Sequence, residues 1–179
     1  MPRNQMGLYR VTPTRAVGLV LVASSGALGT ALLSQYVGGL QPCVLCLYQR
    51  VPYVLIIILS VLALLLMIVR GSPRSALMRG VLAVCAAIFL AGAGIAAFHV
   101  GVEQGWWAGT DACTSADLNS MTPAQLREHL LQAPIVRCDE VAWSLFGVSM
   151  AGYNFLASLA LSGSSLWLAQ AICRRATAA

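Results

Sequence analysis

Long uncharged apolar segments separated by short charged stretches dominate the chain. Four of them are long enough to cross the hydrocarbon core of a bilayer, which takes about 20 helical residues. We expect spans at about 16–34, 51–69, 80–102 and 150–172. An apolar segment in lipid must satisfy its own backbone hydrogen bonds, so each span is predicted to be an α-helix. The pattern predicts an all-α membrane protein, a four-transmembrane-helix bundle forming a single domain over residues 1–179.

Composition excludes the soluble and the disordered classes. Of the 179 residues, 59% are hydrophobic and 9% are charged, whereas about 25% of a typical globular domain is charged. Disorder requires low hydrophobicity and high charge. The net charge of +5 comes with eleven arginines and no lysine. These arginines are scattered in twos and threes between apolar runs, so we expect no nucleic-acid partner.

The first apolar segment could also be a signal peptide, because basic residues precede it. Its apolar run is longer than the usual signal core of 7–15 residues, and no A-x-A cleavage site follows it. We therefore expect it to remain as the first span.

The arginines predict the orientation of the bundle. Arg50, Arg127 and Arg137 fall on one side, and the other eight fall on the opposite side. By the positive-inside rule, both termini and the loop between the second and third spans are cytoplasmic. The exported loops then cover about 35–50 and 103–142. The longer loop contains all six acidic residues.

The long exported loop contains one local helix signal. Thr122 precedes Pro123, and Gln125 follows three positions after the threonine, which is typical of a helix start. Leucines then share one face until Pro134. We expect a short amphipathic helix that either rests on the membrane surface or packs within the loop.

The predicted topology divides the six cysteines into two groups. Cys85 and Cys173 lie in the third and fourth spans, and we interpret both as structural. The other four are exported, on the side of the membrane that permits disulfides. They are Cys43, Cys46, Cys113 and Cys138.

Three interpretations of the exported cysteines remain open. Structural disulfides are common in exported segments, although a Cys-x-x-Cys ring is small and adds little stabilisation. Four cysteines can also bind zinc, but Cys113 and Cys138 are 25 positions apart. We favour redox exchange, because a Cys-x-x-Cys at a helix N-terminus stabilises a thiolate.

Arg50 supports the redox interpretation. It follows Cys46 by four positions, so both point to one face of a helix. A cation there favours a Cys46 thiolate and attracts an oxyanion on a bound acceptor; alternatively, Arg50 only anchors the helix end. Pro52 either kinks a helix that begins near Cys43 or marks a fresh helix start.

Electrons from two dithiols need an acceptor, and the chain has no Gly-rich nucleotide loop and no Cys-x-x-Cys-His haem site. A quinone dissolved in the bilayer fits this role, because it is apolar and takes two electrons and two protons. We expect no metal cofactor.

Several motifs together resemble the bacterial DsbB family, disulfide bond formation protein B. They are Gln41-Pro42-Cys43-Val44-Leu45-Cys46, Tyr48-Gln49-Arg50, the Cys113…Cys138 loop and Trp143-Ser144-Leu145-Phe146-Gly147 before the last span. The resemblance covers about residues 8–173. It implies a multi-pass protein of the inner membrane that re-oxidises a periplasmic thioredoxin-fold protein, DsbA, and passes electrons to ubiquinone or menaquinone.

The resemblance also implies roles for individual residues. The partner's thiolate attacks Cys113 of a Cys113–Cys138 disulfide, and Cys138 then exchanges with Cys43. The freed Cys46 faces the quinone, with Arg50 near a quinone oxygen. Gln49 stands where some members carry an acid, which leaves the local proton route open. His99 is either near the quinone, as in some members, or a packing residue.

Three alternative functions remain open. A vitamin K epoxide reductase-like enzyme also couples thiols to quinone, but usually carries its Cys-x-x-Cys late in the chain. A structural membrane protein would use the exported disulfides only for stability. A small transporter would show an ionisable residue in mid-span, and only His99 is a candidate.

Overall fold

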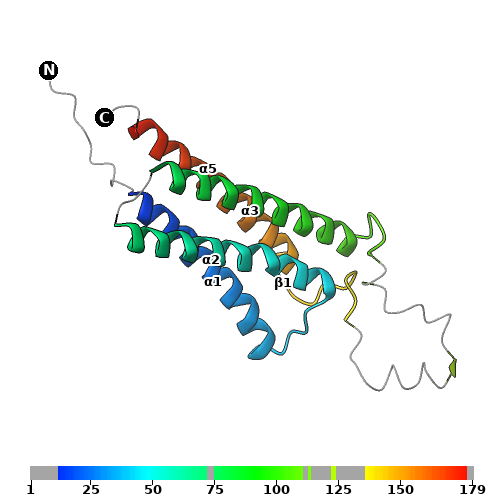
Figure 1. The fold of residues 1–179 in the computed structure, drawn as a ribbon. Coiled ribbons are helices and arrows are strands. Elements are labelled where there is room, and N and C mark those ends of the chain that lie inside the picture. The colour runs from blue at the N-terminus through cyan, green and yellow to red at the C-terminus, as the bar shows by residue number, and fades with distance from the viewer. Residues whose placement is uncertain (1–11, 72–74, 111–112, 114–121, 124–135, 177–179) are drawn as a thin grey trace.

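The computed structural model describes residues 12–71, 75–110, 113, 122–123 and 136–176. Within these residues four long helices run through the molecule, and α1 leans away from the others at its C-terminal end (Figure 1). Each is long and apolar enough to cross a membrane. The predicted all-α, four-span fold is therefore confirmed. The helices are α1 (Pro13–Tyr36), α2 (Val44–Arg70), α3 (Ser75–Glu103) and α5 (Met150–Ala176).

Of the two starts that the sequence left open for the second helix, the structure has the earlier one. It starts at Val44, with Cys43 as its N-cap, and continues through Pro52. Arg50 therefore lies inside α2 and not in an exported loop. A Cβ on Gly92 would lie 3.2 Å from Cγ of Pro52, so α3 approaches α2 closely where the proline interrupts the backbone hydrogen bonds. Glycine at position 92 makes this approach possible.

A short hairpin, which the sequence analysis did not predict, leads into the last helix. β1 (Ser144–Leu145) and β2 (Val148–Ser149) pair antiparallel. Phe146 and Gly147 both have positive φ, at 50° and 78°, the combination that suits a two-residue hairpin turn. The hairpin holds Ser149 directly before α5.

The core lies where the four helices meet. Ile56 of α2, with Met78, Leu82 and Phe89 of α3, is fully buried there, and α1 contributes Val17. Many large apolar side chains on the outer faces are exposed, as spans facing lipid require.

The two cysteines predicted to be structural lie apart from the exported loops. Cys85 is buried in the core formed by the four helices. Cys173 lies near the C-terminal end of α5, where Nη1 of Arg79 is 3.1 Å from its sulfur. The amphipathic helix predicted after Thr122 falls almost wholly outside the described residues.

Candidate active site

The first turn of α2 holds a pair of free thiols. Cys43 and Cys46 are both unbonded, and their sulfurs lie 2.9 Å apart. As the N-cap residue, Cys43 accepts a hydrogen bond at its sulfur from the backbone N–H of Cys46, at 3.3 Å. A Cys-x-x-Cys at a helix start brings both thiols within one turn. Here the sulfur of Cys43 is the one that accepts the hydrogen bond from the backbone.

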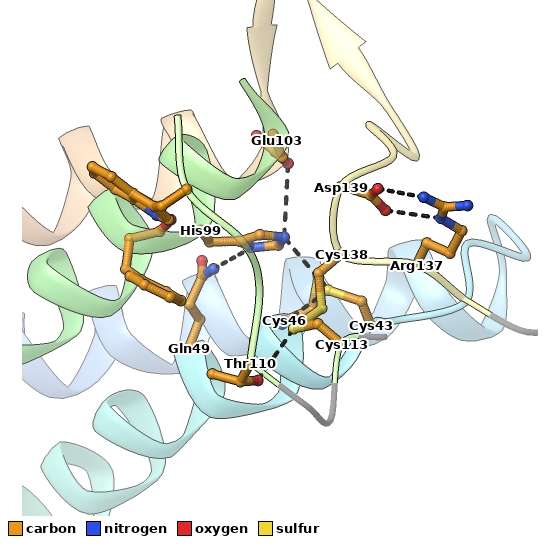
Figure 2. Close-up of a disulfide and its surroundings, with 12 residues drawn as sticks. Cys43, Cys46, Gln49, His99, Glu103, Thr110, Cys113, Arg137, Cys138 and Asp139 are labelled. Carbon is orange, nitrogen blue, oxygen red and sulfur yellow. Dashed lines mark hydrogen bonds and ion pairs between the residues drawn. A yellow bond between two sulfur atoms is a disulfide. The ribbon is translucent and has the colours of Figure 1, made fainter. Parts of the chain in front are cut away.

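The second cysteine pair is a disulfide that packs on the first. Cys113 is bonded to Cys138, and both are buried in one cluster with Cys43. Figure 2 shows the disulfide directly beside the Cys43–Cys46 pair. The structure thus brings together four cysteines that are up to 95 positions apart in the sequence, from Cys43 to Cys138.

The C-terminal turn of α3 supplies an imidazole and a carboxylate to this cluster. His99 is buried, and its Nε2 lies 3.5 Å from the sulfur of Cys43. On the same side, Oε1 of Glu103 lies 3.9 Å from Nε2, and that side chain is 5% exposed. The hydroxyl of Ser149 donates to the other oxygen of Glu103. A cavity lies beside these side chains, and Cys46, His99 and Glu103 are among the residues that line it.

A chain of polar side chains continues from His99 into the bundle. Nδ1 of His99 is 2.7 Å from the amide nitrogen of Gln49, and Nδ2 of Asn154 donates to Oε1 of Gln49 at 2.6 Å. The hydroxyl of Tyr53 donates to Oδ1 of Asn154 at 2.5 Å and lies 3.2 Å from Oγ of Ser158. The chain ties α2, α3 and α5 together.

The donors around Cys43 make it the thiolate of the reduced pair. The pKa of Cys43 is lowered to about 4, first by the thiol of Cys46, which donates to its sulfur. The ring of His99 and the N–H of Cys46 add to this effect, and burial opposes it. The N–H of Cys46 and the ring of His99 lie at the sulfur of Cys43; the expected effect of Arg50 on a thiolate at Cys46 stays a prediction.

Arg50 is fixed to the first helix. Its Nη1 donates to Oε1 of Gln35 at 2.6 Å, and Nη2 lies 3.5 Å from the carbonyl oxygen of Ala31. Arg50 and Cys46 line the same cavity, as their spacing on one helix face predicts. The cation is therefore placed beside the dithiol by a bond to α1.

The sulfur geometry does not favour zinc. Cys113 and Cys138 are bonded to each other, so the four cysteines do not present four thiolates. The 2.9 Å between the sulfurs of Cys43 and Cys46 is shorter than tetrahedral Zn–S bonds of about 2.3 Å would leave between two ligands. The pair is arranged to form a bond between its sulfurs.

Sequence comparison identifies the family. The family model described as "Disulfide bond formation protein DsbB" matches residues 13–168. The chain belongs to the DsbB family. Disulfide bond formation protein B of Saccharophagus degradans (strain 2-40) is 30% identical over 166 residues, covering 90% of this chain and 96% of that protein. The Haemophilus influenzae (strain Rd) protein of the same name is 30% identical over 146 residues, covering 80% and 78%.

A further similar protein has a name that states no function. It is "Uncharacterized protein RP370" of Rickettsia prowazekii, 28% identical over 150 residues, covering 82% of this chain and 83% of that protein. No solved structure matches the chain. The family assignment, confirming the resemblance seen in the sequence, makes this a multi-pass membrane protein of disulfide bond formation.

Sequence reasoning identified the cysteines, Arg50 and His99 as candidates. It missed Glu103 and Gln35, which contact His99 and Arg50, and Asn154, which bonds to Gln49. Glu103 follows His99 by four positions, so the helical spacing could have placed both on one face. Asn154 is polar within an apolar span, which is a signal in itself. Gln35 gave no comparable signal, because nothing in its local pattern indicates that α1 passes Arg50.

Proposed function

We propose that this protein re-oxidises a periplasmic, DsbA-like thiol oxidant and passes the electrons through its two cysteine pairs to a membrane quinone. It would lie in the bacterial inner membrane with both termini cytoplasmic and both cysteine pairs facing the periplasm. The observation that carries the proposal is the burial of the Cys113–Cys138 disulfide in one cluster with Cys43, because disulfide exchange requires the sulfurs to meet.

The exchange would run in the order that the contacts allow. The partner's thiolate attacks the sulfur of Cys113, the Cys113–Cys138 bond breaks, and Cys138 leaves as a thiolate. Cys138 then attacks Cys43 of a Cys43–Cys46 disulfide and releases Cys46. The partner's second thiol then displaces Cys113 and completes the partner's disulfide. The freed Cys113 thiolate attacks Cys138 of the Cys138–Cys43 bond, re-forms the Cys113–Cys138 disulfide and releases Cys43. One partner dithiol has then become a disulfide, and the Cys43–Cys46 disulfide has become a dithiol.

The present arrangement corresponds to the end of that exchange. Cys113 and Cys138 are bonded, whereas Cys43 and Cys46 are free. A thiolate at Cys43 is the nucleophile that the reverse reaction needs and the leaving group that the forward reaction needs. A leaving thiol of low pKa leaves faster, so the donors around Cys43 favour its release.

The residues beside the dithiol fit a quinone. The cavity is lined by Ala31 and Ser34 of α1, by Cys46 and Arg50 of α2, by Trp143 directly before β1 and by Met150, the first residue of α5. The apolar part of the wall suits an apolar ring, and the cation of Arg50 suits one of its two carbonyl oxygens; Arg137, Glu103 and Glu140 also line the cavity. A bound quinone supplies an acceptor for two electrons and two protons. Arg50 would hold one quinone oxygen, and His99 and Glu103 would hold protons at the rim of the cavity.

Quinone absorbance tests the proposal. Purified protein in detergent is mixed with a water-soluble ubiquinone, or a menaquinone analogue, and a reduced thioredoxin-fold periplasmic protein. We expect catalytic loss of quinone absorbance that disappears in Cys43→Ser and in Cys113→Ser and persists in Cys85→Ala. Absence of turnover with either quinone, with both exported pairs found as permanent disulfides, would favour a purely structural role.

A further inference from the structure

We propose that Gln49, held by Asn154, is a positioning residue that keeps His99 neutral, with its ring proton on Nε2 facing the sulfur of Cys43. The inference deepens the proposed function, since it assumes only that Cys43 is the redox cysteine. It concerns a property of the reduced protein that can be measured without quinone or partner.

The hydrogen-bond chain has two possible directions, and they give His99 different charges. In the first, Tyr53 donates to Asn154, Asn154 donates to Gln49, and Gln49 donates to Nδ1 of His99. Nδ1 then carries no proton, and the ring is a neutral Nε2–H donor. In the second, both amides are reversed, Gln49 accepts from Nδ1–H, and a proton on Nε2 as well makes the ring a cation.

The distances at the inner end of the chain favour the first direction. The hydroxyl of Tyr53 lies 2.5 Å from Asn154 and 3.2 Å from Oγ of Ser158. The contact between Tyr53 and Asn154 is as short as the shortest O–H···O bonds, whereas N–H···O bonds are usually about 2.9 Å long. Tyr53 therefore donates to Oδ1 of Asn154, which leaves the amide nitrogen of Asn154 to face Gln49, at 2.6 Å.

The outer end of the chain requires a proton on Nε2. This nitrogen faces the sulfur of Cys43 at 3.5 Å and Oε1 of Glu103 at 3.9 Å. The main-chain carbonyl of Cys138 is a further acceptor for the ring. The described groups on this side of the ring are acceptors, and Gln49 occupies the other nitrogen. Gln49 is 6% exposed, so its amide depends on these protein partners.

A neutral His99 ring that donates to Cys43 keeps the thiolate reactive. A hydrogen bond stabilises the sulfur of Cys43, but a full positive charge in the same buried place would stabilise it much further. Thiolate nucleophilicity falls as the thiol becomes more acidic. Among the described residues, the titratable groups nearest His99 are Cys43, the N-cap of α2, and Glu103 of α3. Cys46 and Arg50 of α2, with Arg137 and Glu140 before β1, line the same cavity. Ser149 of β2 and Asn154 of α5, which border this cluster, are neutral.

The test combines nitrogen NMR of labelled histidine with the titration of Cys43. The chain has two histidines, and a His129→Gln variant assigns the His99 signals. In the reduced protein at neutral pH we expect one ring proton, on Nε2. In Gln49→Glu the carboxylate accepts from Nδ1, and Asn154 still donates to its other oxygen. We therefore expect both ring nitrogens to be protonated and the midpoint of thiolate formation at Cys43 to fall by about one pH unit.

Two further variants separate positioning from folding. Gln104→Glu makes the same change at an exposed residue one position beyond Glu103 and should alter neither the tautomer nor the midpoint. Gln49→Met keeps the size without a donor and should give a mixture of the two tautomers. A proton on Nδ1 in the wild-type reduced protein, or an unchanged ring in Gln49→Glu, would overturn the inference. A correct tautomer in a protein that reduces no quinone would instead refute only the proposed function.

Discussion

Replacing His99 by phenylalanine removes one donor from the Cys43 thiolate while filling the same buried space. The sulfur of Cys43 accepts from the Cys46 thiol, from the ring of His99 and from the N–H of Cys46. A hydrogen bond to a charged group contributes about 1.5–3 kcal/mol, and each pKa unit corresponds to about 1.36 kcal/mol. Starting from about 4, the pKa of Cys43 should therefore rise by about one to two units in His99→Phe.

The assay is the rate at which iodoacetamide alkylates Cys43 in reduced protein, followed by mass spectrometry as a function of pH. Only the thiolate reacts, so the midpoint of the profile reports its formation even where burial slows the reaction. His99→Gln retains a side-chain N–H and should fall between the wild type and His99→Phe. An unchanged midpoint in His99→Phe, or a wild-type midpoint near the ordinary thiol value, would refute the assignment of the thiolate to Cys43.

The remaining predictions concern potential, turnover and quinone use. The lowered pKa of Cys43 predicts that reduction of the Cys43–Cys46 disulfide at neutral pH takes up one proton, so that its potential should fall by about 30 mV per pH unit in redox-buffer titrations; a slope near 59 mV at neutral pH would contradict the low pKa. Because the pKa of Cys43 is lower in the folded than in the unfolded protein, the free energy of unfolding of the reduced protein should decrease as pH falls from about 9 to about 4. The oxidised protein, in which Cys43 does not titrate, should show no such decrease, as paired denaturation curves would test. Cys85→Ala and Cys173→Ala should retain turnover, and Arg50→Gln should raise the apparent KM for quinone more than it slows exchange with the partner; equal effects on both reactions would place Arg50 outside the quinone site.

The helices could be predicted from the sequence because the membrane imposes a strict local rule. Each span must be apolar for about 20 residues, and the four longest uncharged runs meet this condition. The start of α2 could not be predicted in the same way. Arg50 and Pro52 both suggest a boundary, yet the helix begins at Val44, since Arg50 bonds to α1 and Gly92 leaves room for the proline.

The chemistry of the site was predictable only in part, for a related reason. The Cys-x-x-Cys motif and the arginine one turn later are local patterns, so sequence reasoning found them. The contact between Cys43 and the Cys113–Cys138 disulfide joins residues that are 70 to 95 positions apart in the sequence. Likewise, Gln49 of α2 contacts His99 of α3 and is held in turn by Asn154 of α5. Contacts of that kind follow from packing, which no single segment specifies.

The buried amides explain how one set of contacts can serve both folding and reaction. A polar group in a membrane bundle costs several kcal/mol when it has no partner, so Gln49 and Asn154 each bond to residues on neighbouring helices. Those bonds fix the relative rotation of α2, α3 and α5. They equally fix which nitrogen of His99 faces Cys43. A change that loosened the packing at Asn154 should therefore be felt at the sulfur through the orientation of a single amide, without any direct contact between the two.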